Sequence, residues 1–129
     1  MNIFDSWICN KYIAHRGLHD ETTPENSIGA FKKAIEAGYA IELDVRPLAD
    51  GTLVVFHDDR LGRMTGKDGF IANYTYEDLK DITLLKSKEH IPTFKEVLDE
   101  VDGQTPLLIE IKNSGKVGFE KDVWKLLSK

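Results

Sequence analysis

The sequence has a single cysteine, Cys9, and no long hydrophobic run. One cysteine cannot form a disulfide within the chain, which agrees with a reducing compartment. Residues 1–14 lack the basic start and unbroken apolar run of a secretory signal, and no stretch approaches the roughly 20 apolar residues that cross a bilayer. We therefore expect a cytoplasmic protein that does not insert into membranes.

Local clusters of Lys and Arg are also missing, and the formal net charge is −5. This charge provides no attractive field for nucleic acid or an anionic membrane, so we expect neither as a partner. Gly and Pro are few, whereas 41% of the residues are hydrophobic and 30% are charged. That balance excludes a disordered chain and is typical of one folded domain.

The stretch over residues 40–59, AIELDVRPLADGTLVVFHDD, places charged residues inside apolar strand patterns. Glu42 and Asp44 are two residues apart, so they point to one face of an extended strand while their aliphatic neighbours point to the other. Burying two like charges is unfavourable unless a counter-ion or a water-filled site takes up the charge. Glu42 and Asp44 are therefore candidates for a functional site.

A second apolar run, residues 53–56, ends in His57. Between the two runs lies Asp50-Gly51, which is the commonest two-residue hairpin signal. A hairpin with that turn places His57 directly across from Asp44. Two parallel strands are the alternative, although so short a connection leaves no room for a helix. In either arrangement His57 and the carboxylates can reach one end of the sheet.

Two further strand patterns end in charged residues. A short apolar run ends in His15 and Arg16, and the run over residues 107–111 carries Glu110, with Lys112 following on the same face. A surface strand end is the ordinary interpretation of the first pair, and a simple ion pair is that of the second. However, the carboxyl ends of buried strands are where α/β sheets and barrels build their sites. The repeated pattern therefore favours a site.

Helix signals lie between and after these strands. A first helix is expected between an N-cap at Ser27 and a stop at Gly38. Capping boxes predict helices over residues 75–82 and 93–101, and an amphipathic pattern predicts a last helix over residues 119–129. Strand, loop, helix and strand form a βα unit, which predicts parallel strands covered by helices.

Three carboxylates can form an all-oxygen donor set: Glu42, Asp44 and Glu110. Such a set suits Mg²⁺ or Ca²⁺ better than Zn²⁺, which prefers nitrogen and sulfur. A cation flanked by Arg16 and Lys112 would suit an anionic group such as a phosphate ester. Of His15 and His57, one can take a proton from the attacking oxygen while the other gives one to the leaving oxygen. This combination fits phosphodiester cleavage.

Several separated blocks resemble, in order and spacing, the glycerophosphodiester phosphodiesterase family. These blocks are HRG at 15–17, PENS at 24–27, ELDV at 42–45, DG at 50–51, HD at 57–58, IPT at 91–93 and EIK at 110–112. The resemblance spans nearly the whole chain from residue 12 onward. It implies a TIM-barrel-like (β/α) fold related to phosphatidylinositol-specific phospholipases. It also implies hydrolysis of glycerophosphodiesters to glycerol 3-phosphate and an alcohol.

The resemblance also implies roles for residues at matching positions. His15 and His57 would be the acid/base pair. Glu42, Asp44 and Glu110 would be the metal ligands for Mg²⁺ or Ca²⁺. Arg16 and Lys112 would contact the phosphate, and Glu25 and Asn26 would brace the first loop.

Length is the main departure from the family. A closed barrel of eight βα units needs about 250 residues, so residues 1–129 are expected to form a single domain equivalent to the N-terminal half. Open strand edges and an uncovered inner face favour association. We therefore hypothesise either an N-terminal portion of a longer enzyme, whose missing C-terminal half completes the barrel, or a half-barrel that pairs with another copy as a homodimer. The isolated chain could then be inactive.

Two alternative functions remain open at this point. The first is a non-catalytic half-barrel that binds a cation or phosphate without turnover and needs a partner half. The second keeps the phosphodiesterase chemistry but acts on inositol or sphingolipid head groups. The sequence does not indicate the head group, because its contacts would lie largely in strands beyond this half.

Overall fold

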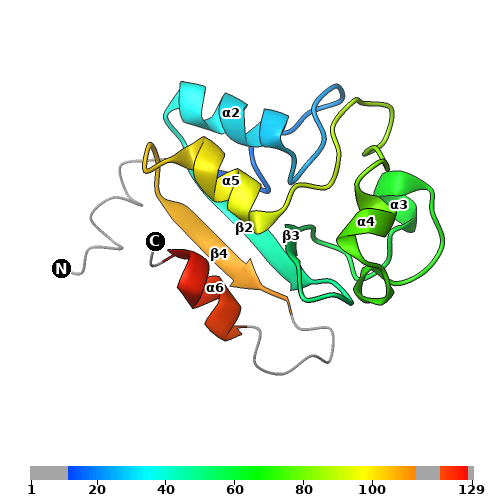
Figure 1. Ribbon diagram of the computed structural model, residues 1–129. Helices are drawn as coiled ribbons and strands as arrows, with labels where there is room; N and C mark the ends of the chain where they lie inside the picture. The colour runs from blue at the N-terminus through cyan, green and yellow to red at the C-terminus, as the bar shows by residue number, and fades with distance from the viewer. Residues whose placement is uncertain (1–11, 113–119, 128–129) are drawn as a thin grey trace.

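A central strand, β2, organises the fold (Figure 1). The computed structural model describes residues 12–112 and 120–127. The strands are β1 (Ile13–His15), β2 (Ala40–Pro47), β3 (Leu53–Val55) and β4 (Leu107–Ile111). β1 and β4 both run parallel to β2, whereas β3 is antiparallel to it. Val45 pairs with Val55 and Ile111 at once, so β3 and β4 lie on opposite sides of β2.

The expected helices form where their end signals lie. In α2 (Ile28–Ala37) the side chain of Ser27 accepts a hydrogen bond from the Ala30 amide, and Gly38 ends the helix in the left-handed conformation. Capping boxes begin α4 (Tyr76–Leu79) and α5 (Phe94–Val101) as predicted, although α4 ends earlier than expected. The last helix, α6 (Glu120–Leu127), falls within its expected range. Two short elements, α3 (Gly62–Thr65) and η1 (Ile71–Asn73), precede α4.

Alternation along β2 separates an apolar face from a charged face. Ile41, Leu43 and Val45 are fully buried and pack with residues of α2, α5 and α6 in one hydrophobic core. Glu42 and Asp44 therefore point to the opposite face of the sheet. The fold thus supports the charged face from behind with a packed apolar layer.

A second hydrophobic core lies under α3 and α4, beyond the end of β2 (Figure 1). Its largest members include Phe56, Leu61 and Ile71, all almost completely buried. β3 connects the two cores, since Val55 packs in the first and Val54 in the second. The segment that follows His57 is thereby anchored by its own apolar cluster.

The connection between β2 and β3 is a hairpin, which rules out parallel strands. Its register differs by one residue from the prediction, because Val45 pairs with Val55 and the Phe56 amide donates to the Asp44 carbonyl at 3.0 Å. His57 therefore does not lie across from Asp44. The turn holds three residues rather than two: the Leu48 amide donates to the Thr52 carbonyl, and Gly51 adopts φ of +86°.

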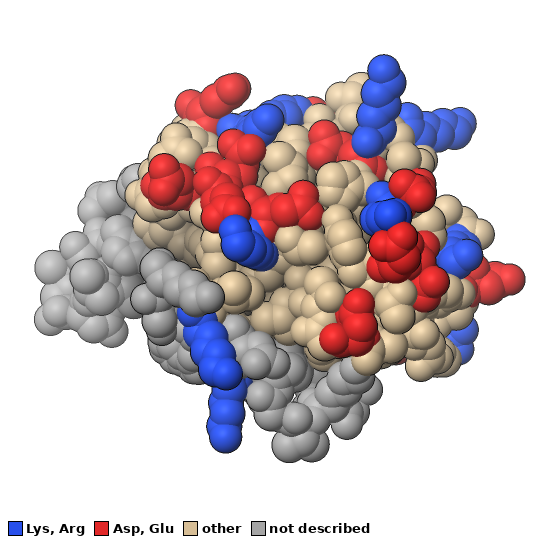
Figure 2. All heavy atoms as spheres, viewed as in Figure 1, with Lys and Arg blue, Asp and Glu red and all other residues tan. Residues whose placement is uncertain are grey.

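Charge is distributed unevenly over the surface. Figure 2 shows acidic side chains gathered over α5, which carries Glu96, Asp99 and Glu100, whereas the Lys and Arg side chains on this face lie mostly apart. The acidic side chains over α5 are in keeping with the net charge of −5. Within the described residues, none of the helices combines the length and apolar character that crossing a bilayer requires.

Gly17, in the loop after β1, lies close to Ala30 in the first turn of α2, and a substitution can test this close approach. At its φ of +82°, an added Cβ would lie 2.8 Å from the Cβ of Ala30. We expect Gly17→Ala to lower the free energy of unfolding by about 2–4 kcal/mol, combining backbone strain with overpacking. Gly51→Ala is a matched control: φ is similar, but no atom lies within 4 Å. It should lose only about 1–2 kcal/mol. Urea denaturation measures both losses, and equal losses would contradict the packing argument.

Candidate active site

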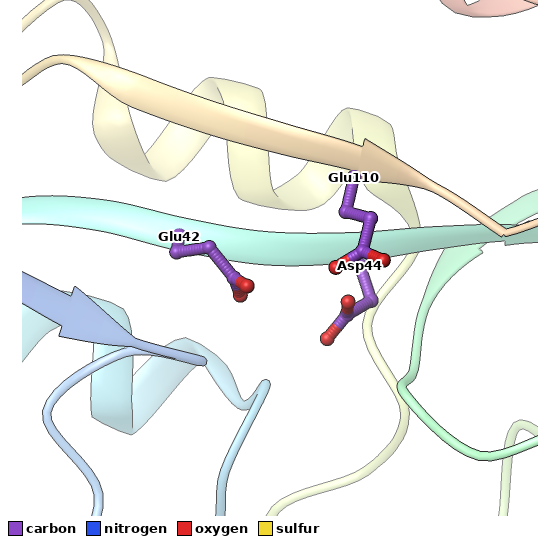
Figure 3. Close-up of side chains that lie close together, drawn as sticks. All are labelled: Glu42, Asp44 and Glu110. Carbon is purple, nitrogen blue, oxygen red and sulfur yellow. The ribbon is translucent and has the colours of Figure 1, made fainter.

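Three carboxylates converge on the charged face of the sheet (Figure 3). Glu42 and Asp44 project from β2, and Glu110 projects from the neighbouring strand β4. The parallel register pairs Asp44 directly with Glu110. One oxygen from each carboxylate can be chosen so that all of them lie within 4.8 Å of one another. The predicted donor set is therefore assembled in space.

Burial leaves part of this negative charge uncompensated. Asp44 is fully buried and the Glu42 side chain is 18% exposed. Asp44 Oδ1 and Glu42 Oε1 are buried and accept no hydrogen bond from any described residue. Burial, and then the charge of Asp44, raise the pKa of Glu42. By contrast, a hydrogen bond from Lys112 lowers the pKa of the exposed Glu110. Two buried oxygens without a hydrogen bond, beside a third carboxylate, fit a hard divalent cation.

Arg16 and Lys112 approach Asp44 from the ends of different strands. Lys112 Nζ lies 2.7 Å from Glu110 Oε1 and 3.9 Å from Asp44 Oδ1. Arg16 Nε lies 4.0 Å from Asp44 Oδ2, while its Nη1 donates to Glu25 Oε2 at 3.0 Å. Positive charge thus flanks the carboxylates on both sides, an arrangement that can hold an anionic group next to a cation.

The loop that carries Glu25 and Asn26 fixes the Arg16 loop. The Asn26 amide donates to the Arg16 carbonyl at 2.8 Å, and Asn26 Nδ2 donates to Asp44 Oδ2 at 3.1 Å. Arg16 and Asn26 both have positive φ, 58° and 51°, which non-glycine residues rarely adopt. These hydrogen bonds hold an unfavourable backbone in place, so the loop geometry depends on the surrounding structure.

The two candidate histidines have different surroundings. His15 Nε2 lies 3.4 Å from Glu42 Oε2, and the His15 side chain is 65% exposed. His57 Nδ1 lies 2.8 Å from Asp58 Oδ1, and Arg46 Nε donates to the His57 carbonyl at 3.0 Å. His15 is thus in direct contact with the carboxylate cluster, whereas His57 is held by its own neighbours.

Sequence reasoning placed Arg63 only in the loop that follows His57 and assigned it no role of its own. From α3, its guanidinium bonds to both Glu25 and Asp58 and so connects the first loop to the segment after β3. No periodicity or capping signal marks Arg63. Glu25 is 38 residues away in the sequence, and Asp58 lies outside any helix or strand, so no local pattern connects Arg63 to either partner. Only the fold of the second core places it there.

A cavity of about 840 Å³ opens beside His57. It is lined both by residues of the candidate site and by residues near the second core. These residues include His57, Asp58, Arg63, Lys112, Phe70 and Asn73. A small-molecule substrate could therefore lie between the charged face of the sheet and the segment that precedes α4.

Comparison with known proteins agrees with the geometry. Residues 15–126 match the model of the glycerophosphoryl diester phosphodiesterase family. A glycerophosphodiester phosphodiesterase of Caldanaerobacter subterraneus is 42% identical over 109 residues, covering 78% of this chain and 44% of that protein. The glycerophosphodiester phosphodiesterase structure from Agrobacterium tumefaciens is similar with a TM-score of 0.82 and 28% identity, over 92% of this chain and 52% of that one.

A phosphodiesterase from Oleispira antarctica, solved in complex with the product sn-glycerol-3-phosphate, matches with a TM-score of 0.73 and 33% identity. This match covers 79% of the present chain and 44% of that chain. The chain thus spans about half the length of the curated relatives and structures it matches. The expected TIM-barrel-like fold is confirmed as a partial barrel. The chain belongs to the glycerophosphoryl diester phosphodiesterase family.

Proposed function

We propose that this chain carries the catalytic half of a hydrolase that cleaves glycerophosphodiesters to glycerol 3-phosphate and an alcohol. The observation that carries the proposal is the cluster of Glu42, Asp44 and Glu110. Two of its buried oxygens accept no hydrogen bond from a described residue, and Arg16 and Lys112 flank it. The product complex of the Oleispira antarctica relative supports the choice of substrate class. The chain spans about half the length of this relative, so the hydrolytic activity of a complete barrel is itself proposed.

In this proposal Glu42, Asp44 and Glu110 hold one divalent cation, Mg²⁺ or Ca²⁺. When bound, the cation would polarise a phosphoryl oxygen of the substrate. Oxygen ligands suit either ion, and the donor set does not distinguish them. Arg16 and Lys112 would orient the phosphate by charge-assisted hydrogen bonds from two sides.

His15 and His57 would share the proton transfers. One takes a proton from the attacking water and the other returns one to the departing alkoxide. Glu25 and Asn26 would act through Arg16, by holding its loop against Asp44. Their role would be to position Arg16 and not to contact the substrate.

A second half would complete the barrel. Among the described residues, Glu110 is exposed on the charged face, and the apolar side chains of Ile13 in β1 and Ile111 in β4 are exposed on edge strands. We propose that residues 1–129 form one domain that supplies the cation ligands and histidines. A C-terminal half or a second copy would then supply the remaining wall. We also propose a cytoplasmic location, because a single cysteine agrees with a reducing compartment.

A non-catalytic function is the second candidate, because a cation and phosphate site does not by itself imply turnover. In that case the same residues would bind a cation and a phosphate group without turnover. A change of substrate to inositol or sphingolipid phosphodiesters would leave the described residues in the same roles.

Substituting the histidines tests the proposed chemistry. With Mg²⁺ or Ca²⁺, release of glycerol 3-phosphate from glycerophosphocholine should fall roughly 100- to 10,000-fold in His15→Ala or His57→Ala. His19→Ala is the matched control, because His19 is an exposed loop histidine and should keep a rate close to wild type. Retained activity in either site variant would show that the pair is misassigned. No release by the unaltered chain with either ion would favour the non-catalytic function.

Removing the charge of Glu42 should affect the free energy of unfolding differently from removing the charge of Glu110. Because the pKa of Glu42 is raised by burial and by Asp44, the ionised carboxylate opposes folding above that pKa. In protein freed of metal by a chelator, Glu42→Gln should therefore raise the free energy of unfolding at pH 7. The gain should shrink as the pH falls from the raised pKa toward 4.5, the ordinary Glu value, and should be absent below it.

Glu110→Gln is the control for this stability change. The pKa of Glu110 is lowered by its Lys112 hydrogen bond, so removing its charge should give no gain in stability. Both variants should nevertheless weaken Mg²⁺ binding in calorimetric titration, because each removes a proposed ligand. A Glu42→Gln variant that is less stable than wild type at pH 7 would contradict the assignment of uncompensated charge.

Association tests the proposed second half. Size-exclusion chromatography with light scattering should give a mass above that of one chain, since the edge strands carry exposed apolar side chains among the described residues. Substituting the exposed Ile111 with Lys should shift the population toward monomer. A clean monomer at high concentration, with little binding of a hydrophobic dye, would count against pairing with another copy.

A further inference from the structure

We infer that Arg63 is a positioning residue that fixes the ring of His57 through Asp58 and links it to the Arg16 loop through Glu25. This inference rests on the proposed function, in which His57 transfers a proton. It assigns a role to a side chain outside the residues that bind the cation or the phosphate. The geometry of four hydrogen bonds from one guanidinium carries it.

Arg63 uses two edges of its guanidinium for two carboxylates. On one edge Nε donates to Asp58 Oδ2 at 2.8 Å and Nη2 to Asp58 Oδ1 at 3.1 Å. On the other, Nη1 donates to Glu25 Oε1 and Nη2 to Glu25 Oε2, both at 2.9 Å. A planar fork can satisfy two carboxylates in this way, whereas a Lys ammonium is a point charge without such directionality.

Asp58 passes this orientation on to His57. Its Oδ1 lies 2.8 Å from His57 Nδ1 and also accepts the bond from Arg63 Nη2. When a carboxylate holds the Nδ1 hydrogen, Nε2 is left as the ring nitrogen that can accept a proton. The backbone of His57 is held separately, by bonds from Arg46 to its carbonyl. Arg63 therefore positions the imidazole ring of His57 and not its backbone.

Glu25 joins the other candidate loop to the same guanidinium. It is 9% exposed and also accepts a bond from Arg16 Nη1 at 3.0 Å. Burial would raise the pKa of Glu25, but the hydrogen bonds and charges of Arg63 and Arg16 outweigh it and lower the pKa. One buried carboxylate thus sets the distance between the proposed phosphate contact Arg16 and the segment that carries His57.

The network stays ionised over the ordinary pH range. The Arg63 hydrogen bond is the main cause that lowers the pKa of Asp58 from 3.8 to about 2. A lowered carboxyl pKa stabilises the fold above the ordinary value, and that contribution is lost as the pH falls from about 4 toward 2. The positioning of His57 is therefore a fixed feature of the site and not a switch.

The tautomer of His57 tests the inference. In protein labelled with ¹⁵N-histidine at pH about 9, where imidazoles of ordinary pKa are neutral, long-range ¹H–¹⁵N spectra report which ring nitrogen carries the hydrogen. Wild type should show His57 in the Nδ1–H form. Arg63→Lys and Asp58→Asn should each reduce that form to a minor or mixed population. Glu25→Gln should preserve it, because the Asp58 edge of the fork stays intact.

Arg60→Lys serves as the matched control. The Arg60 guanidinium lies 4.3 Å from the centre of the Phe70 ring, near Arg63 in the sequence but on a different partner. It should leave the His57 signals unchanged, and the exposed His19 should report no change in any variant. If His57 keeps the Nδ1–H form in Arg63→Lys, the inference is wrong, whatever Asp58→Asn shows.

Kinetics separate this inference from the proposed function. If the chain turns over glycerophosphodiesters, Arg63→Lys should lower kcat by up to about 100-fold with little change in KM, since it displaces a proton-transfer group and removes no substrate contact. Because the tautomer measurement needs no turnover, an inactive chain with a fixed His57 would overturn the function and leave the positioning intact. A loss confined to KM would instead assign Arg63 to substrate binding and overturn its positioning role.

Discussion

Two like charges on the buried side of one strand are the constraint around which this structure is arranged. Glu42 and Asp44 share a face of β2 because of strand alternation, and Asp44 is fully buried. Such a pair is tolerated only with compensation. Asn26, Arg16 and Lys112 provide part of it, yet one oxygen of each carboxylate keeps no hydrogen bond from a described residue. The remaining imbalance is what makes the cluster suitable for a cation.

The loops around this cluster are held by contacts that each serve more than one group. Asn26 bonds to the Arg16 carbonyl and to Asp44, and it holds a positive φ while doing so. Glu25 accepts bonds from two arginines that come from different parts of the chain. Preorganisation of this kind is what electrostatic catalysis needs, because groups that are already fixed do not have to reorganise during the reaction.

The division into two hydrophobic cores explains how half a barrel can present such a site. One core lies behind β2 under α2, α5 and α6, and the other lies under α3 and α4, with β3 contributing to both. Both are built from residues of this chain, and neither uses the charged face. The charged face therefore stays separate from both cores.

Local signals in the sequence were sufficient for the strands, for the longer helices and for one side of the site. Alternation placed Glu42 and Asp44 on one face, and Ser27, Gly38 and the capping box at Thr93 set helix ends, because these effects act within a few residues. The tertiary structure alone decided the rest. It paired Asp44 with Glu110, set Phe56 and not His57 opposite Asp44, and brought Arg63 to Glu25. Those contacts join segments that are distant in sequence or depend on a one-residue difference in a turn, so packing and register determine them and no short pattern can.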